Sequence, residues 1–139
     1  MIYPLVVTAL TTGMRAGEIF NLRVQDLNFR EGIIHIRDSK SGENGVAYMS
    51  EHLKEILKEL AKGKKPYEHV FKKPNGKTFD AAPDVWKTII RDLGFNKDIT
   101  DTREKVVFHT LRHTFCSWLP WQEFPSTSSK NLPVTRQFR

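Results

Sequence analysis

Cysteine is nearly missing from this sequence of 139 residues, because Cys116 is the only one. A single cysteine cannot form a disulfide within the chain, and this usage is typical of proteins from a reducing compartment. Long apolar runs are missing too. The apolar N-terminal stretch over residues 1–10 is too short to span a bilayer, and it lacks the basic start and cleavage site of a signal peptide. We therefore expect a cytoplasmic protein.

Negative charge is also in short supply. The chain has 22 lysines and arginines against 16 aspartates and glutamates, which gives a net charge of +6. This excess suits a polyanionic partner such as nucleic acid or an acidic membrane surface, although charge alone does not choose between them. The length indicates one domain or a piece of a larger one, and a hydrophobic content of 39% allows a core.

Apolar residues at helical spacing, bounded by serine, glycine and proline, predict most of the secondary structure. The helices expected from this pattern cover residues 4–12, 15–23, 51–62, 81–93 and 106–119. Residues 32–50 alternate in a way that indicates strand, turn and strand, with Gly42 and the pair Asn44-Gly45 favouring the turn. The expected fold class is α+β, a mostly helical domain with a small antiparallel β-sheet or hairpin.

The first candidate site is the stretch HTLRH over residues 109–113. A helix would bring His109, Arg112 and His113 onto neighbouring faces. An arginine held by packing presents a planar fork that fits two phosphate oxygens, and a histidine beside it can move a proton near neutral pH. The alternative is a buried histidine satisfied by the backbone, next to an arginine at a helix end. The two histidines are four residues apart, but neither an HExxH glutamate nor a cysteine pair supports a metal site.

A second candidate is TTGMRAGEIFNL over residues 11–22. Gly13 permits a sharp turn that places Arg15 at the start of a helix, where backbone N–H groups favour an anion. Glu18 lies one turn further on and could orient the arginine. The alternative is an exposed ion pair between Arg15 and Glu18, which would contribute little.

The third candidate is Lys40, which follows the first strand of the expected hairpin. A lysine at a hairpin tip can reach into a groove or donate a proton to a leaving oxygen. More often such a lysine is simply solvated, so this position carries little weight by itself.

Taken in order, the three candidates form one pattern: A-L-x-x-G-x-R-x-x-E over residues 9–18, then the hairpin lysine, then H-x-x-R-H about a hundred residues after the first arginine. This pattern resembles the catalytic domain of the tyrosine recombinases, the phage integrase family, which includes Xer-like enzymes. The resemblance covers roughly residues 5–119. It implies the helical fold expected above, and a site that needs neither a metal nor a nucleotide cofactor.

The resemblance also implies roles for single residues. In that family a tyrosine attacks the scissile DNA phosphate and forms a 3′-phosphotyrosyl link. By resemblance, Arg15 and Arg112 would clamp the non-bridging phosphate oxygens. Lys40 would protonate the leaving 5′-oxygen, and His109 would assist proton transfer. Glu18 and His113 match supporting positions that brace this cluster.

The sequence departs from the family pattern after His113. A leucine-glycine-histidine motif and the nucleophilic tyrosine should follow, but no histidine or tyrosine does. The three tyrosines, at positions 3, 48 and 67, all precede the cluster. A covalent mechanism cannot proceed without its nucleophile. We therefore expect a chain that binds DNA without cleaving it.

The segment over residues 120–139 has no apolar period and is rich in proline and serine. Codons for residues 120–138, read two bases later, can encode an apolar helix followed by the missing glycine and histidine. We hypothesise a lost nucleotide near the codons for Leu119 and Pro120. The expected organisation is a partial catalytic domain over residues 1–119, truncated at both ends, and an aberrant, disordered tail over residues 120–139.

Three functions remain open from the sequence. The first is a DNA-binding fragment of a site-specific recombinase. The second is a non-catalytic DNA-binding or regulatory module that competes at recombination sites. The third is an unrelated helical nucleic-acid binder. We expect double-stranded DNA as the partner, with other recombinase subunits as a further partner, and neither a membrane nor a small-molecule substrate.

Overall fold

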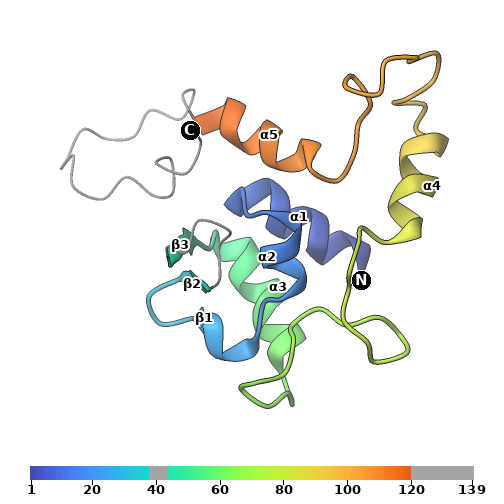
Figure 1. Cartoon of the computed structure of the whole chain (residues 1–139). Coiled ribbons are helices and arrows are strands. Elements are labelled where there is room, and N and C mark those ends of the chain that lie inside the picture. Colours follow the sequence, from blue (N-terminus) through green and yellow to red (C-terminus); the bar gives the residue numbers. More distant parts are fainter. Residues whose placement is uncertain (38–43, 120–139) are drawn as a thin grey trace.

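Five α-helices lie to one side of a small sheet in the computed structural model, which describes residues 1–37 and 44–119 (Figure 1). The helices are α1 (Ile2–Thr12), α2 (Ala16–Phe20), α3 (Glu51–Ala61), α4 (Asp84–Asp92) and α5 (Thr110–Trp118). The strands are β1 (Leu27–Asn28), β2 (Ile33–Ile36) and β3 (Gly45–Tyr48), and a short 3-10 helix, η1 (Val24–Asp26), precedes β1. The expected α+β class is confirmed.

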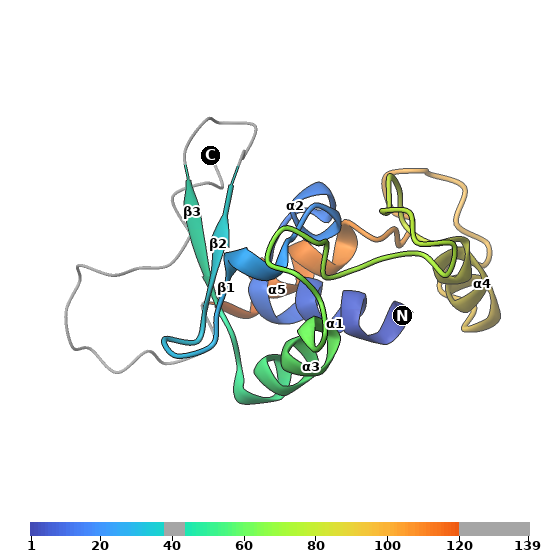
Figure 2. The same ribbon diagram turned by 90° about the horizontal axis from the view of Figure 1, so that it is seen from below.

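The sheet has the antiparallel order β1-β2-β3. Ile34 and Ile36 of β2 are buried while His35 and Arg37 are exposed, as the alternating sequence predicts. Ile34 pairs with Ala47 of β3 on one side and with Leu27 of β1 on the other. Sequence analysis missed β1, because a strand of two residues is too short to show alternation. Figure 2 shows the helices gathered on one side of the sheet.

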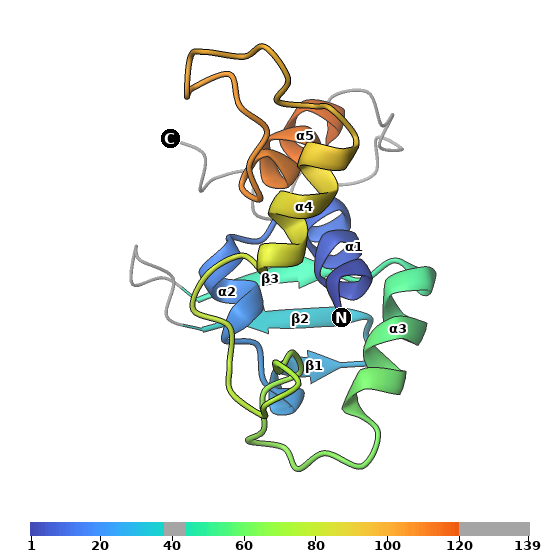
Figure 3. The ribbon, with the colours of Figure 1, turned by 90° about the vertical axis from the view of Figure 1, so that its right-hand side faces the viewer.

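The helix α1 lies at the centre of the described fold and packs against α2, α3 and α5 (Figure 3). Its residues Leu5 and Ala9 are buried, which joins the N-terminal helix to the core under the sheet. The helix α3 begins at Ser50, whose hydroxyl accepts a hydrogen bond from Leu53 N–H at 3.2 Å, as the capping pattern predicts. The first and third expected helices are therefore confirmed.

The other three helices are shorter than predicted. The helix α2 ends at Phe20, because the Asn21 side chain donates to Gly17 O at 2.9 Å and the chain then forms a bridge between Arg23 and His69. The helix α4 begins after Pro83, since a proline disfavours helical backbone at the residue before it.

The helix α5 begins at Thr110, several residues later than the apolar pattern suggested. The Asn96 side chain holds Val106 from both sides, donating to its O at 3.0 Å and accepting from its N–H at 2.7 Å. Thr110 Oγ1 then accepts from Val107 N–H at 2.9 Å and opens the helix. As a result, His109 sits just before α5 instead of inside it.

An aromatic cluster connects α4 and the segment before α5 to the rest of the core. Phe108 packs against Phe20 with ring centroids 5.7 Å apart, and edge-on against Trp86 at 5.5 Å. Phe20 also contacts Phe79 at 5.8 Å. These contacts anchor the chain immediately before His109. In the described ranges, no helix is long and apolar enough to cross a membrane.

Candidate active site

The corner between α1 and α2 holds the first candidate arginine. Gly13 adopts left-handed backbone with φ 66° and donates its N–H to Ala9 O at 3.1 Å, which ends α1. The chain then turns sharply, and Arg15 becomes the N-terminal cap of α2. The prediction of a glycine turn that places Arg15 at a helix start is confirmed.

Glu18 holds Arg15 at two points. Its Oε2 accepts the backbone N–H of Arg15 at 2.7 Å, and its Oε1 lies 3.2 Å from Arg15 Nη1. The Glu18 side chain is 8% exposed and that of Arg15 is 33% exposed. The exposed pair considered from the sequence is therefore wrong, because the carboxylate is buried and fixes both the backbone and the guanidinium of Arg15.

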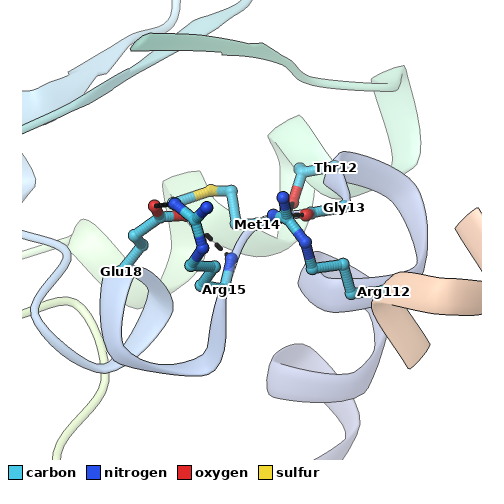
Figure 4. Close-up of polar contacts among 6 residues, drawn as sticks. All are labelled: Thr12, Gly13, Met14, Arg15, Glu18 and Arg112. Atoms are coloured by element: carbon cyan, nitrogen blue, oxygen red, sulfur yellow. Dashed lines mark hydrogen bonds and ion pairs between the residues drawn. The ribbon is translucent and has the colours of Figure 1, made fainter. Parts of the chain in front are cut away.

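The second arginine reaches the same corner from the far end of the chain. Arg112 is 5% exposed and donates from Nη1 to the backbone O of Gly13, 99 residues away in sequence. Figure 4 shows the guanidinium groups of Arg15 and Arg112 flanking the turn that carries Gly13 and Met14. Burial and the charge of Arg15 both lower the pKa of Arg112, whereas Glu18 raises it. The two arginines are thus close enough to repel each other.

The two histidines lie beside this pair. The rings of His109 and His113 meet edge-on with centroids 4.8 Å apart, and both residues are exposed on their residue average. Partial burial of the ring lowers the pKa of His109, and the charges of His113, Arg112 and Arg15 lower it further. The lowered pKa favours the neutral form of His109, in which one ring nitrogen can accept a proton.

A groove of about 1000 Å³ opens beside the corner. Arg15, Glu18 and His109 are among the residues that line it. Arg112 is not among the lining residues, and its guanidinium contacts Gly13. Lys40 falls in 38–43, outside the described residues. Of the four residues expected to act on phosphate, the structure brings Arg15, His109 and Arg112 together.

Further polar residues of this groove were not predicted from the sequence. Arg23, Asp26, His35 and Arg37 line it, within or next to η1 and β2. One signal was available, because RVQD over residues 23–26 repeats the R-x-x-acid spacing of RAGE over residues 15–18. In both stretches the acidic side chain accepts the backbone N–H of the arginine three residues earlier. Asp26 is one of the few buried charged residues of the described chain.

Within residues 1–37 and 44–119, no group of three or more His, Cys, Asp or Glu side chains is placed to hold a metal ion. Cys116 has a free thiol whose pKa is raised by burial. The polar side chains that line the groove are those of arginine, histidine, glutamate, aspartate, asparagine and glutamine.

The fold matches those of solved recombinases. The crystal structure of XerA recombinase superimposes with a TM-score of 0.63 at 29% identity, covering 87% of this chain and 44% of that one. The Tn1549 transposon integrase, solved in complex with circular intermediate DNA, gives a TM-score of 0.68 at 21% identity, covering 88% of this chain and 48% of that one. The described residues have the fold of a tyrosine recombinase catalytic domain.

The sequence agrees with the fold. It matches the model of the phage integrase family over residues 3–128. The tyrosine recombinase XerA of Saccharolobus solfataricus is 32% identical over 108 residues, which cover 78% of this chain and 33% of that protein. The chain belongs to the phage integrase family, so the unrelated nucleic-acid binder is excluded. It spans about a third of the length of this relative.

Proposed function

We propose that the chain is a DNA-binding part of a site-specific tyrosine recombinase. The observation that carries this proposal is the meeting of Arg15 and Arg112 at one corner, although they come from opposite ends of the described chain. Two positively charged groups are held at this corner, and an anion in the adjoining groove would be attracted to them. A DNA phosphate is the anion that suits a guanidinium pair with a neutral histidine beside it.

The charge of the whole chain supports duplex DNA as that partner. The net charge of +6 favours a polyanion, and the similar Tn1549 integrase was solved with DNA bound. Most contacts of such a protein would be to the DNA backbone, so binding should weaken steeply with salt. We propose a cytoplasmic protein that also contacts other recombinase subunits at its DNA sites.

Each site residue has a proposed role. Arg15 binds non-bridging phosphate oxygens directly, since it lines the groove. Arg112 adds positive charge from its place beside Gly13, and it also fixes Gly13. The position of Arg15 depends on the turn at Gly13. His109 accepts or passes a proton, and Glu18 and His113 support the two groups beside them. Lys40 remains the proposed proton donor to the leaving 5′-oxygen.

We propose that these residues bind DNA without cleaving it. Tyr3, Tyr48 and Tyr67 are each at least half exposed, and none of them lines the groove. Tyr3 instead contacts His52, with Tyr3 Oη 2.8 Å from Nε2. A phosphate bound at Arg15 therefore has none of the three tyrosines of this chain beside it.

The boundary near Leu119 is also part of the proposal. Residues 120–139 lie outside the described residues, and the family match continues past Leu119 to residue 128. A lost nucleotide near the codons for Leu119 and Pro120 predicts that the downstream DNA encodes, in another frame, a glycine-histidine and a tyrosine. Sequencing the gene tests this. An in-frame homologue that shares the same tail would contradict it.

The DNA-binding proposal is tested with the full chain and a mixed-sequence DNA duplex. We expect the logarithm of the association constant for DNA to fall linearly with the logarithm of the salt concentration. A pool of nicked suicide duplexes of randomised sequence should yield no covalent protein–DNA adduct. Absence of salt-dependent binding would overturn the DNA proposal, and a covalent adduct would overturn the claim that the chain does not cleave.

A further inference from the structure

Arg37 lines the same groove as Arg15 and Arg23 and is the one of the three that is paired with the buried Asp26. Arg37 follows β2, its side chain is 59% exposed, and it lines the same groove as Arg15 and His109. The groove volume of about 1000 Å³ lies at the upper end for pockets that hold whole drug-sized ligands. One phosphate at Arg15 would leave much of it empty. What occupies the rest of the groove is inferred from the residues that line it, and this inference rests on the proposed function.

The buried carboxylate of Asp26 contacts Arg37. The Asp26 side chain is 7% exposed, and its Oδ2 accepts the backbone N–H of Arg23 at 3.1 Å. Its Oδ1 lies 2.6 Å from Arg37 Nε, a charge contact that lacks hydrogen-bond alignment. A buried carboxylate is costly unless it is paired, so this contact is expected to hold under native conditions. Asp26 therefore joins the start of η1 to the end of β2.

The contact at Nε determines which part of the guanidinium is presented. Arginine carries five N–H donors, and Asp26 approaches the one nearest the side-chain stem. Among residues 1–37 and 44–119, Asp26 is the carboxylate within ion-pair distance of Arg37. The two Nη groups lie beyond that contact on a side chain that is 59% exposed, and an anchored stem loses less rotamer freedom when they bind.

We propose that Arg37 binds a second backbone phosphate of the duplex, next to the one held at Arg15 and His109, and that Asp26 is its positioning residue. Because Arg15 comes from α2 and Arg37 from the end of β2, the two guanidinium groups would fix the DNA strand at two points. Two points set the direction of the strand along the groove, which one phosphate contact cannot do.

The competing explanation is a purely structural ion pair between η1 and β2. Both explanations predict that loss of Asp26 lowers stability, so stability alone cannot decide between them. They differ for DNA. A phosphate contact by Arg37 must appear in the salt dependence of binding, whereas a structural pair away from DNA must not.

The test compares Arg37→Ala with Arg103→Ala in the full chain on a mixed-sequence duplex. Arg103 is a matched control, because it also pairs with an aspartate, Asp101 at 2.8 Å, but does not line the groove. We expect Arg37→Ala to weaken binding several-fold and to reduce the slope of log affinity against log salt by about one unit. Arg103→Ala should leave the slope unchanged.

The two explanations predict opposite effects of Asp26→Asn on DNA binding. The amide keeps an acceptor for Arg23 N–H but removes one negative charge, so a purely structural Asp26 predicts equal or tighter DNA binding. A positioning role predicts weaker binding and a smaller salt slope, because Arg37 loses its anchor. Thermal unfolding is measured in parallel, and if Asp26→Asn does not fold, the Arg37→Ala comparison still decides.

The outcomes separate this inference from the proposed function. If the unsubstituted chain shows no salt-dependent binding, the proposed function fails and the inference fails with it. If the chain binds DNA but Arg37→Ala and Arg103→Ala have the same slope and affinity, the inference is wrong while the proposed function stands.

Discussion

Arg15 and Arg112 meet at one corner, but they are held in different ways. Arg15 is fixed by neighbours within five residues, Gly13 on one side and Glu18 on the other. Arg112 is fixed by a contact to Gly13 O from 99 residues away, and only when α5 packs against α1. One arginine is thus placed by local sequence and the other by tertiary packing, with Gly13 common to both.

This difference shows which substitutions would disturb one arginine and which would disturb both. Residues near Arg15 can change its own geometry, but a change at Gly13 reaches both arginines. An added Cβ at Gly13 would lie 2.2 Å from Phe115 Cδ1 of α5, so the close approach of α5 depends on this glycine. The predictions below test the local and the tertiary placement separately.

The largest effect is expected for Gly13→Ala. The new side chain must adopt φ 66° and also displace the Phe115 ring. Left-handed backbone and overpacking together should lower the free energy of unfolding by about 3 kcal/mol. Urea unfolding measures this loss, and DNA binding should fall as α5 moves away from the corner.

Gly63→Ala is the matched control for that change. Gly63 also has left-handed backbone, with φ 75°, but an added Cβ there meets nothing within 4 Å. We expect a loss of about 1 kcal/mol from the backbone alone. Equal losses at the two glycines would show that Phe115 does not press against Gly13.

The next effect is expected for Arg112→Lys compared with Arg15→Lys. Arg112 is buried and donates to Gly13 O, and a lysine cannot reproduce its planar fork. We expect Arg112→Lys to cost about 2 kcal/mol and Arg15→Lys about 0.5 kcal/mol in unfolding free energy. Thermal unfolding with and without a DNA duplex gives both stability and binding. A larger stability loss at Arg15 would reverse the comparison of local and tertiary placement.

Glu18→Gln should have a smaller effect. The amide oxygen can still accept Arg15 N–H, but the charge that offsets both arginines is lost. We expect a loss of about 1 kcal/mol, measured by urea unfolding and reduced by added salt. The control is Glu51→Gln, whose exposed side chain lies 3.8 Å from Lys54 Nζ at the same i, i+3 spacing. Glu51→Gln should leave the free energy of unfolding nearly unchanged. An equal loss at Glu51 would show that burial of Glu18 does not add to its contribution to stability.

The smallest effect is a pH dependence at His109. Its pKa in the folded chain lies below the ordinary value of 6.5, mainly through partial burial and then through His113 and the two arginines. As the pH falls through 6.5, the unfolded chain takes up a proton before the folded chain does, so stability is lost from there down to the folded pKa. His109→Gln should remove this part of the decline in melting temperature between about pH 8 and about pH 5.

His69 must be controlled in that experiment. Burial lowers the pKa of His69 as well, so it contributes a decline of the same sign over the same range. His69→Gln measures its share separately. A pH profile of His109→Gln identical to that of the unsubstituted chain would contradict the assignment to His109.

Some of the fold and site could be predicted because the signals are local. The Gly13 turn, the Ser50 cap and the alternation in β2 each depend on residues within a few positions of one another. Helix ends were less predictable. The start of α5 depends on Asn96 contacting Val106 ten residues away, and no local pattern indicates that contact.

The further polar residues of the groove were missed for a related reason. Arg37 has no signal of its own in the sequence, and the R-x-x-acid spacing at Asp26 indicates a contact to Arg23, not to Arg37. Their pairing needs the antiparallel register of β1 and β2, which brings η1 beside the end of β2. The spacing of apolar residues in the sequence does not indicate this pairing.

The sequence alone determined which groups are available to the candidate site: an arginine held by a nearby glutamate, a neighbouring histidine pair, and a positive net charge, because these depend on composition and on spacing of a few residues. Only the tertiary structure decided that Arg112 contacts Gly13 and that Arg37 lines the same groove as Arg15. The physical reason is that both placements come from packing between segments distant in the chain, α5 on α1 and η1 on β2, whose geometry is set by the whole core.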